Sequence, residues 1–298
     1  MSAPPAILDL DHSVGSLPGE QRIALADWQE AIRFGCGLPR MRAFAQVLEQ
    51  RMPPFHEHGT VFMGSGDFHH LSGPLIARCI AAQARAAQRP LRIVVLDNHP
   101  DNMRFPFGVH CGSWVRRVAL LPSVSHVHVL GITSADIGVG HAWENYLMPL
   151  KKGRLTYWSL GVDTGWSRRL GISHAFRSFD TPAAMVDAFV DAQRSQTRPS
   201  YLSIDKDVFA PEVAHTNWDQ GRLQVDHALA IIDSLRHGLV GSDINGEVSH
   251  YRYKTWWKRR LSAMDDQPDI DPAMLTDWQA QQHALNLRLL AAIAAHDG

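Results

Sequence analysis

The chain has 298 residues, of which 45% are hydrophobic and 20% are charged, an ordinary composition for a globular protein. Its formal net charge is -1 at pH 7, so no broad basic field favours nucleic acid or an anionic membrane as a partner. The apolar runs are far shorter than the ~20 residues of a membrane-spanning helix, and the first ten residues do not form a secretory signal. The three cysteines are an odd number without CxxC spacing, so we expect a cytoplasmic protein with reduced thiols.

Short apolar runs that predict buried strands alternate with longer segments that have helical periodicity. In chain order we expect strand Ile7–Leu10, helix Leu38–Arg51, strand Thr60–Met63, helix Leu75–Gln88, strands Leu91–Leu96, His126–Leu130 and Leu155–Trp158, helix Pro182–Gln193 (capped by Thr181), strand Tyr201–Ile204, helix Val225–Arg236, strand Leu239–Gly241 and helix Pro272–Ala295. This alternation predicts a three-layer α/β/α sandwich with a mostly parallel central sheet. We expect one domain over residues 1–298, in which 1–55 and 250–298 are peripheral segments.

Aspartate and histidine cluster directly after four of the expected strands, where open parallel sheets place their ligand sites. The clusters are Gly64–His70, Asp97–Asn102, Asp205–Asp207 and Ser242–Glu247. Each has a structural alternative when taken alone, since a lone DxD pair is usually a solvated turn and adjacent histidines often bond to the backbone. Together, in the same strand-end context, they indicate a functional site.

The second cluster is the most informative. In extended backbone, Asp97, His99 and Asp101 occupy alternate positions and point the same way. Their convergence without a cation would be costly, and a divalent metal removes that cost. Asp205 and Asp207 repeat the alternate spacing. So many carboxylate and imidazole groups, without sulfur, suit two bridged divalent ions, with Mn²⁺ favoured and Ni²⁺, Co²⁺, Fe²⁺ or Zn²⁺ as alternatives.

The order of these motifs resembles the ureohydrolase superfamily, the arginase and agmatinase relatives. The matching segments are GSGDFHHLS (Gly64–Ser72), DNHPD (Asp97–Asp101), SIDKD (Ser203–Asp207) and GEVS (Gly246–Ser249), and the resemblance covers Thr60 to Ser249. It implies an arginase-like fold and six metal ligands: His69, Asp97, His99, Asp101, Asp205 and Asp207. His70 is an alternative to His69, because Phe68 interrupts the usual GGDHS pattern.

The resemblance also implies further site residues. His110 falls where family members carry a proton-shuttling histidine, and Glu247 matches the acid that pairs with a substrate guanidinium. Asp207 would stabilise the nucleophile and pass on its proton. Asp243 would orient a metal ligand without binding the metal itself. Two weaker expectations concern substrate binding: Asp136 could hold an amine, and Arg104 suits a carboxylate or a phosphate.

Two departures from the family pattern concern the substrate more than the metals. Ala210 replaces an aspartate of the SxDxDxxDP motif, and the segment Thr216–Gly221 is unlike the usual arginase or agmatinase loop. The aromatic and basic stretch Tyr251–Arg260 could contact nucleic acid or membrane, but we interpret it as a helix that packs its tryptophans on a neighbouring subunit.

The expected activity is therefore a binuclear metal-dependent hydrolysis. It would cleave a C–N bond of a linear guanidino compound and release urea and an amine. The alternatives are an amide hydrolase similar to the metal-dependent deacetylases and a non-catalytic metal-binding member of the fold. The resemblance implies a homo-oligomer, a trimer or hexamer, with a small-molecule guanidino substrate as its partner.

Overall fold

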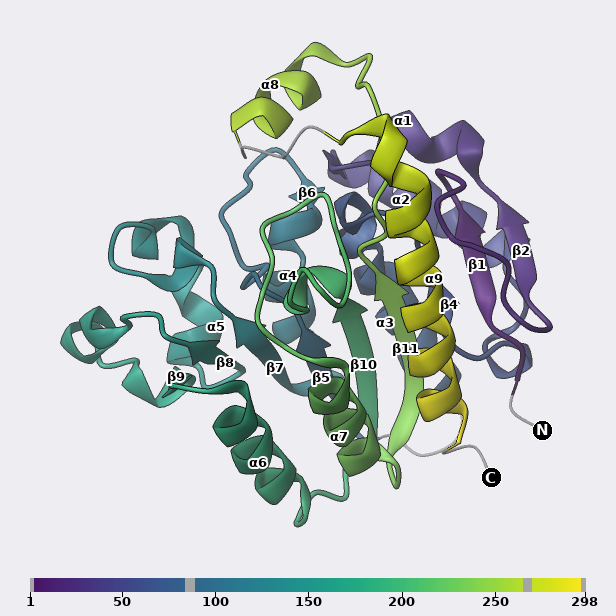
Figure 1. Cartoon of the computed structure of the whole chain (residues 1–298). Coiled ribbons are helices and arrows are strands. Elements are labelled where there is room, and N and C mark those ends of the chain that lie inside the picture. The colour runs from purple at the N-terminus through teal and green to yellow at the C-terminus, as the bar shows by residue number, and fades with distance from the viewer. Residues whose placement is uncertain (1–2, 84–88, 265–269, 296–298) are drawn as a thin grey trace.

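A parallel sheet of nine strands forms the centre of the molecule (Figure 1). The structure is a computed structural model that describes residues 3–83, 89–264 and 270–295. The strand order is β2-β1-β4-β11-β10-β5-β7-β8-β9, and all neighbouring strands in this sheet run parallel. The strands are β1 (Ala6–Asp9), β2 (Gln21–Ala24), β4 (Val61–Phe62), β5 (Leu91–Leu96), β7 (Val124–Ile132), β8 (Leu155–Leu160), β9 (Phe176–Phe179), β10 (Ser200–Asp205) and β11 (Leu239–Asn245). A separate antiparallel pair joins β3 (Gly35–Cys36) to β6 (Val109–His110).

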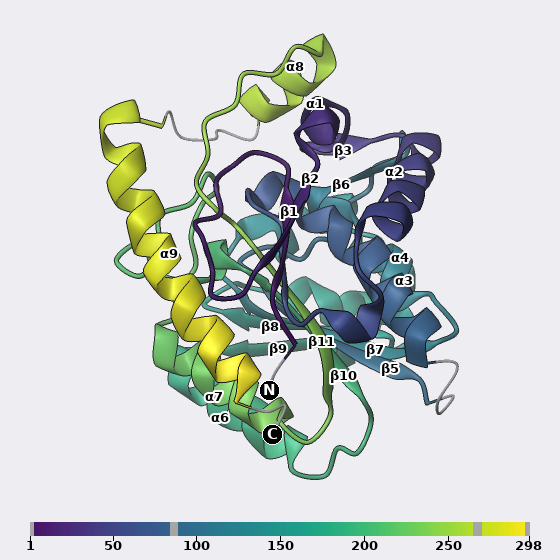
Figure 2. The same cartoon turned by 90° about the vertical axis from the view of Figure 1, so that its right-hand side faces the viewer.

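Helices cover both faces of the sheet, as Figure 2 shows. One face carries α2 (Leu38–Arg51), α3 (Ser72–Gln83), α4 (Val115–Ala119) and α5 (Leu147–Lys151), and the other carries α6 (Pro182–Gln193), α7 (Val225–Leu235) and α9 (Pro272–Ala294). Each layer buries its own hydrophobic cluster against the strands, which is the main stabilising contribution in such a sandwich. The predicted three-layer α/β/α fold is confirmed. Within the described residues, no helix is both long and apolar enough to cross a membrane.

Short helices complete the chain. Two small α-helices, α1 (Gln29–Ile32) and α8 (Trp256–Met264), lie near one end of the molecule (Figure 1). The 3₁₀ helices are η1 (Ala26–Trp28), η2 (Phe55–Glu57), η3 (Gly66–Leu71), η4 (Cys111–Ser113), η5 (Ala135–Ile137), η6 (Ala142–Glu144), η7 (Gly165–Leu170), η8 (Ser173–Ala175) and η9 (Lys206–Val208). Several of them directly follow a strand or its first turn, and this is where the candidate site is built.

Apolar patterning predicts the central elements well and the edge strands poorly. Strand β5 and helices α2 and α6 begin and end at the expected residues, and the other predicted elements overlap the observed ones with shifted ends. The last five residues of the predicted helix Leu75–Gln88 lie outside the described residues. Strands β2 and β9 carry no clear signal because they form the two edges of the sheet and are only partly buried.

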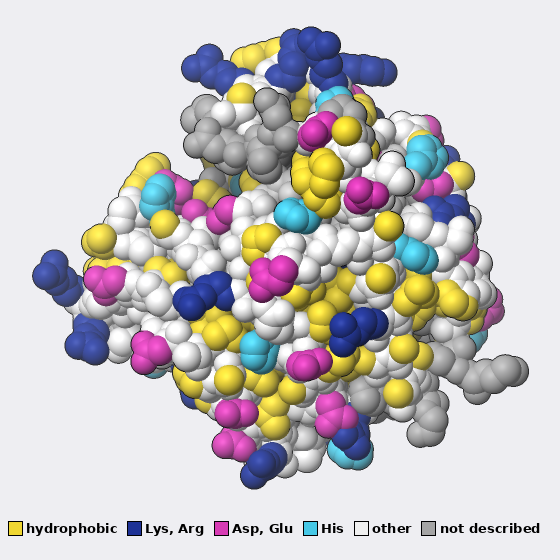
Figure 3. All heavy atoms as spheres, in the orientation of Figure 1, with side chains coloured by type: hydrophobic (Ala, Val, Ile, Leu, Met, Phe, Trp, Pro, Cys, Tyr) yellow, Lys and Arg dark blue, Asp and Glu magenta, His cyan; other side chains and the backbone are white. Residues whose placement is uncertain are grey.

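The segment Tyr251–Arg260 does not form a helix over its whole length. Only its second half belongs to α8, and the first half packs irregularly on its own chain, where the Tyr251 hydroxyl donates to Glu30 Oε2 at 2.7 Å. Trp257 packs against the same chain, whereas the side chain of Trp256 is exposed. Figure 3 shows Lys and Arg side chains gathered over this end of the molecule. The prediction of a continuous helix here is therefore wrong.

The order of the strands brings the site segments together. From β5 the chain adds β7, β8 and β9 outward to one edge, and then returns to insert β10 and β11 between β5 and β4. A reversal of this kind leaves a crevice at the carboxyl ends of the strands, because the connections on its two sides leave in opposite directions. The segments that follow β4, β5 and β10 meet at this crevice.

Candidate metal centre

A tight turn after β4 carries the first candidate ligand into the crevice. Gly64 has a φ of +86°, and a Cβ at this position would lie 2.5 Å from Asp11 Oδ1, so glycine is required there. The Ser65 hydroxyl then accepts a hydrogen bond from the Asp67 amide at 3.3 Å and caps η3. This short helix presents the buried imidazole of His69 to the carboxyl end of β10, where it meets Ser203.

The segment after β5 turns instead of continuing as an extended strand. The His99 amide donates to Asp97 Oδ1 at 2.7 Å, and Asp101 has a φ of +46°, which is uncommon for a residue other than glycine. The indole Nε1 of Trp114 donates to Asp101 Oδ2 at 2.6 Å and helps to hold this conformation. The side chains therefore converge through a turn, and the extended backbone assumed from the sequence is wrong.

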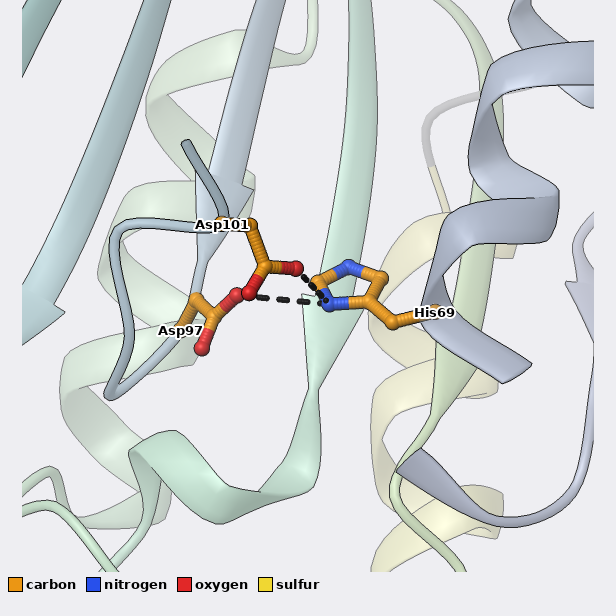
Figure 4. A group of neighbouring side chains, drawn as sticks. All are labelled: His69, Asp97 and Asp101. Atoms are coloured by element: carbon orange, nitrogen blue, oxygen red, sulfur yellow. Dashed lines mark ion pairs between the residues drawn. The ribbon is translucent and has the colours of Figure 1, made fainter. Parts of the chain in front are cut away.

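A first ligand group surrounds one nitrogen of His69. Its Nδ1 lies 2.9 Å from Asp101 Oδ2, 3.3 Å from Asp97 Oδ2 and 3.4 Å from Asp205 Oδ2. Figure 4 shows His69, from η3, pointing at Asp97 and Asp101 from the loop after β5. His69, Asp97 and Asp101 are all buried and close enough together to share one ion. His70 is buried too but is not part of this group.

A second ligand group shares one residue with the first. It consists of Asp97, His99 and Asp207, with His99 Nδ1 2.9 Å from Asp207 Oδ2 and 3.7 Å from Asp97 Oδ1. Asp97 therefore faces His69 with its Oδ2 atom and His99 with its Oδ1 atom. A carboxylate that directs one oxygen to each of two ligand groups has the geometry of a bridge between two cations.

The electrostatics of the two groups favour the charged form of Asp97, whose pKa His69 and His99 lower despite its burial, but disfavour the charged forms of the other three aspartates. Burial and the neighbouring Asp97 raise the pKa of both Asp101 and Asp207 to about 7. Burial and Asp207 raise the pKa of Asp205 to about 8. These acids therefore hold protons near neutral pH when no cation is bound. Burial by itself would lower the pKa of His69, but Asp101 and Asp97 raise it well above its usual value.

These residues fit divalent metal ions. Asp97 Oδ2 is buried and has no hydrogen-bond partner among the described residues, so its lone pairs are available to a cation. The donors around it are carboxylate oxygens and imidazole nitrogens without sulfur, a set that suits Mn²⁺ and related ions. A bound cation would also replace the protons that these carboxyl groups hold.

A hydrogen-bonded chain behind His69 fixes its ring. His69 Nε2 lies 3.0 Å from Ser203 Oγ, and the Ser203 hydroxyl donates to Asp243 Oδ1 at 2.7 Å. Asp243 also accepts hydrogen bonds from the hydroxyl groups of Ser72 and Tyr201. Asp243 therefore reaches the ligand only through Ser203. Such partners set the tautomer and orientation of a ligating histidine.

Asp219 occupies the corresponding position beside His99. Its Oδ1 lies 2.7 Å from His99 Nε2, and its Oδ2 accepts a hydrogen bond from Asn98 Nδ2 at 3.1 Å. The sequence identified the loop around Asp219 only as a departure from the family pattern. Asp219 and His99 are 120 residues apart, so no local spacing could have linked them. Trp114, which donates to Asp101, was also missed, because an indole 13 residues further along the chain carries no recognisable sequence signal.

The two ligand groups open into a cavity of about 540 Å³. Three of the expected substrate or proton-transfer residues line it, namely Arg104, His110 and Asp136, together with the acids Glu144 and Asp219. Burial lowers the pKa of His110 to about 4, so the ring is neutral at pH 7. This value is well below the ~6.5 of an unperturbed histidine. His110 must therefore gain a proton before it can give one.

The structure does not bring Glu247 into this cavity. Its Oε1 lies 2.5 Å from Lys206 Nζ and accepts a hydrogen bond from Asn286 Nδ2 at 2.6 Å, and all three side chains are buried. Lys206, the middle residue of the DxD pair, neutralises this carboxylate. Gly246, with a φ of +88°, turns the backbone just before it. The expected contact between Glu247 and a substrate guanidinium has no support in this geometry.

Comparisons with known proteins agree with this fold. Residues 39–250 match the model of the arginase family. An uncharacterised protein of Thermotoga maritima is 26% identical over 226 residues, covering 72% of this chain and 70% of the relative. Proclavaminate amidino hydrolase from Streptomyces clavuligerus has a similar fold, with a TM-score of 0.53 at 16% identity over 98% of this chain and 93% of that one.

A formiminoglutamase of Trypanosoma cruzi, solved with Mn²⁺, also has a similar fold, with a TM-score of 0.51 at 11% identity over 94% of this chain and 75% of that one. At such low identities the two solved structures show the fold alone. The family match spans the segments after β4, β5, β10 and β11, which carry the four motifs. The chain therefore belongs to the arginase family.

Proposed function

We propose that this protein is a binuclear metal-dependent hydrolase that cleaves a C–N bond of a linear guanidino compound and releases urea and an amine. The observation that carries the proposal is the position of Asp97, which directs one carboxylate oxygen to each of two ligand groups. We assign His69, Asp97, Asp101 and Asp205 to one ion and Asp97, His99 and Asp207 to the other, with Mn²⁺ as the favoured metal.

The names of two proteins with a similar fold support the proposed substrate class and the proposed metal. One is an amidino hydrolase, and another was solved with Mn²⁺. The amide-hydrolase alternative needs only one metal ion. It therefore does not explain the second ligand group, around His99 and Asp207. Membership of the arginase family makes a hydrolase the natural reading of this site, and the guanidino substrate is our extension of it.

The residues of the chain would bind and orient a cationic substrate. Two divalent cations at this site would lower the pKa of a water molecule toward neutrality and so supply a nucleophile. Because Glu247 is paired with Lys206, we assign the cationic group of the substrate to an acid that lines the cavity, Asp136 or Glu144. Arg104, exposed at the same cavity, suits an anionic group at the other end of the substrate.

His110 is the group we assign to proton transfer. Its Nδ1 accepts a hydrogen bond from the Gly112 amide at 3.1 Å, which orients the ring at the cavity wall. As a neutral imidazole it can take up a proton during the reaction and return it to the leaving amine. Asp207, beside His99, is the acid we assign to holding the proton of the attacking water.

We also propose that Asp219 positions His99. The change Asp219→Asn removes the negative charge beside His99 Nε2 while keeping the size of the side chain, and should weaken the binding of one of the two metal ions and lower kcat about 10- to 100-fold. Metal titration and steady-state kinetics measure both quantities. The exposed Asp226, on α7, offers the matched control Asp226→Asn, which should change neither. A rise in KM with unchanged metal affinity would instead make Asp219 a substrate-binding acid.

A urea-release screen with Mn²⁺-loaded protein tests the proposed function. The substrates are linear guanidino compounds with and without a carboxylate at the far end. We expect urea from at least one of them and about two metal ions per chain. Two bound metals with no urea, together with hydrolysis of a simple amide, would favour the amide-hydrolase alternative. Full metal binding with no hydrolysis of either class would favour the non-catalytic alternative.

A further inference from the structure

A second cavity lies at the end of the sheet opposite the candidate metal centre. It has a volume of about 280 Å³ and is formed where α6 and α7 end and where β5, β10 and β11 begin. All strands of the sheet are parallel, and the metal-centre segments follow their carboxyl ends, so this cavity lies at the amino ends of the strands. Figure 1 shows the amino ends of β10 and β11 in its lower part. It shares no lining residue with the cavity at the metal centre.

Four arginines line this cavity, and they are unequally paired. Arg194 pairs with Asp191 and Arg236 with Asp233, each within its own helix end. Arg92 and Arg198 have no ion-pair partner among the residues that the structure describes. The segment 84–88, just before β5, contains no acid in its sequence. Within the described part of the chain, two positive charges at this cavity are therefore left without a counter-charge.

Arg92 is the more unusual of the two because it is buried. Its side chain is on β5, the residue is only 5% exposed, and its Nη2 atom donates to Ser200 Oγ at 3.1 Å. Its Nε atom is buried and has no hydrogen-bond partner in the described chain. A buried guanidinium normally pairs with a carboxylate or another anion, because its desolvation is costly. An anion that enters the cavity would supply the missing partner.

The surroundings of Arg92 are positive rather than acidic. Burial, with the charge of Arg198, lowers the pKa of Arg92 to about 10, so the group stays charged at pH 7. Burial also lowers the pKa of His126, on the neighbouring strand β7, to about 4, and the charges of Arg92, Arg154 and Arg177 act in the same direction. Gln193 adds a buried acceptor, Oε1, for which the described residues supply no hydrogen-bond donor. A ligand with both negative oxygens and a hydroxyl would satisfy Arg92 and Gln193 together.

We propose that this cavity binds a small phosphate-type oxyanion, held by the guanidinium groups of Arg92 and Arg198 and by the Ser200 hydroxyl. Guanidinium groups bind such anions through pairs of charge-assisted hydrogen bonds. The volume lies just below the ~300 Å³ at which small-molecule pockets usually begin, so it suits a small ligand. The ligand is either free inorganic phosphate or the phosphate group of a small phosphorylated compound. This site is independent of the proposed hydrolase activity.

Calorimetric titration with inorganic phosphate, in a buffer free of sulfate, tests the proposal. Both Mn²⁺-loaded and EDTA-treated protein should bind one phosphate per chain with the same Kd, because the site lies far from the metal ligands. Arg92→Met should weaken binding at least about 10-fold, and Arg198→Ala about 3- to 10-fold. Arg198 is exposed, so its removal leaves the fold intact. The control Lys152→Ala removes one exposed positive charge directly after α5 and should leave the Kd within about twofold.

Three results of this titration would overturn the proposal. They are no saturable binding at millimolar phosphate, binding that disappears with EDTA, and equal weakening by Lys152→Ala and Arg198→Ala. A second titration separates the two sources of the ligand. Glycerol phosphate that binds more tightly than phosphate indicates a phosphorylated compound, and the reverse order indicates the free ion. Succinate that binds more tightly than both would also overturn the proposal, since it would make the site a carboxylate site.

Discussion

Replacing Asp97 by asparagine is expected to abolish turnover and to reduce bound metal from about two ions per chain to less than one. Asp97 faces both ligand groups, one through each carboxylate oxygen, so a single change weakens both sites. The activity should fall by more than roughly 100-fold. Changing a residue that only hydrogen-bonds to a metal ligand typically lowers activity or metal affinity by 10- to 100-fold, and Asp97 is itself a proposed ligand. Metal analysis after gel filtration and the urea-release assay measure the two effects.

The control for this variant is Asp163→Asn, the same chemical change at an exposed position. It should keep the metal content and activity of the unaltered protein. Metal-free Asp97→Asn should still fold but unfold at a somewhat lower temperature than the metal-free parent, because it loses the contacts with His69 and His99 that hold the pKa of Asp97 below its usual value. An Asp97→Asn protein that folds, binds two metals and releases urea at the normal rate would refute the proposed centre.

Adding Mn²⁺ to the EDTA-treated protein is expected to raise the thermal unfolding midpoint strongly, and more at high pH than at low pH. Binding of one ion at a free concentration of about 1,000 times its Kd adds about 4 kcal/mol to the free energy of unfolding. For a chain of this size, this raises the unfolding midpoint by on the order of 10 °C. Differential scanning fluorimetry at about pH 6 and about pH 8.5 measures the midpoint with and without the metal.

The pH dependence follows from the raised carboxyl pKa values. Asp101 and Asp207 have a pKa of about 7, and Asp205 of about 8, all above the value of an unfolded aspartate. At these three carboxyl groups the folded metal-free state binds more protons than the unfolded state, so their contribution to stability falls as the pH rises toward 8. A metal ion must displace these protons, so its affinity rises over the same range.

A matched experiment with Asp97→Asn shows whether the effect comes from this centre. The variant should lose most of the stabilisation by Mn²⁺ at both pH values. A Mn²⁺ effect that is the same at about pH 6 and about pH 8.5, or that survives in the variant, would place the metal elsewhere on the protein.

The sequence by itself determined the central architecture. Runs such as Leu91–Leu96 are apolar at every position because β5 is buried on both faces, and α6 begins at Pro182 after the Thr181 cap, as its residues predict. The acids and histidines that end β5 and β10 were recognisable because parallel strands direct their carboxyl ends to a common edge. The structure brings all six expected metal ligands to that edge.

Only the tertiary structure decided which charged groups face one another. The sequence could not show that Lys206 would be buried against Glu247, or that Asp219 would contact His99, from which it is 120 residues distant in sequence. It could not show either that Arg92 would lie near Arg198 with no ion-pair partner among the described residues. The physical reason is that hydrophobic patterning specifies which residues are buried, whereas the partner of a buried charge depends on segments distant in sequence. Those partners set the pKa values, and with them the chemistry that each group can perform.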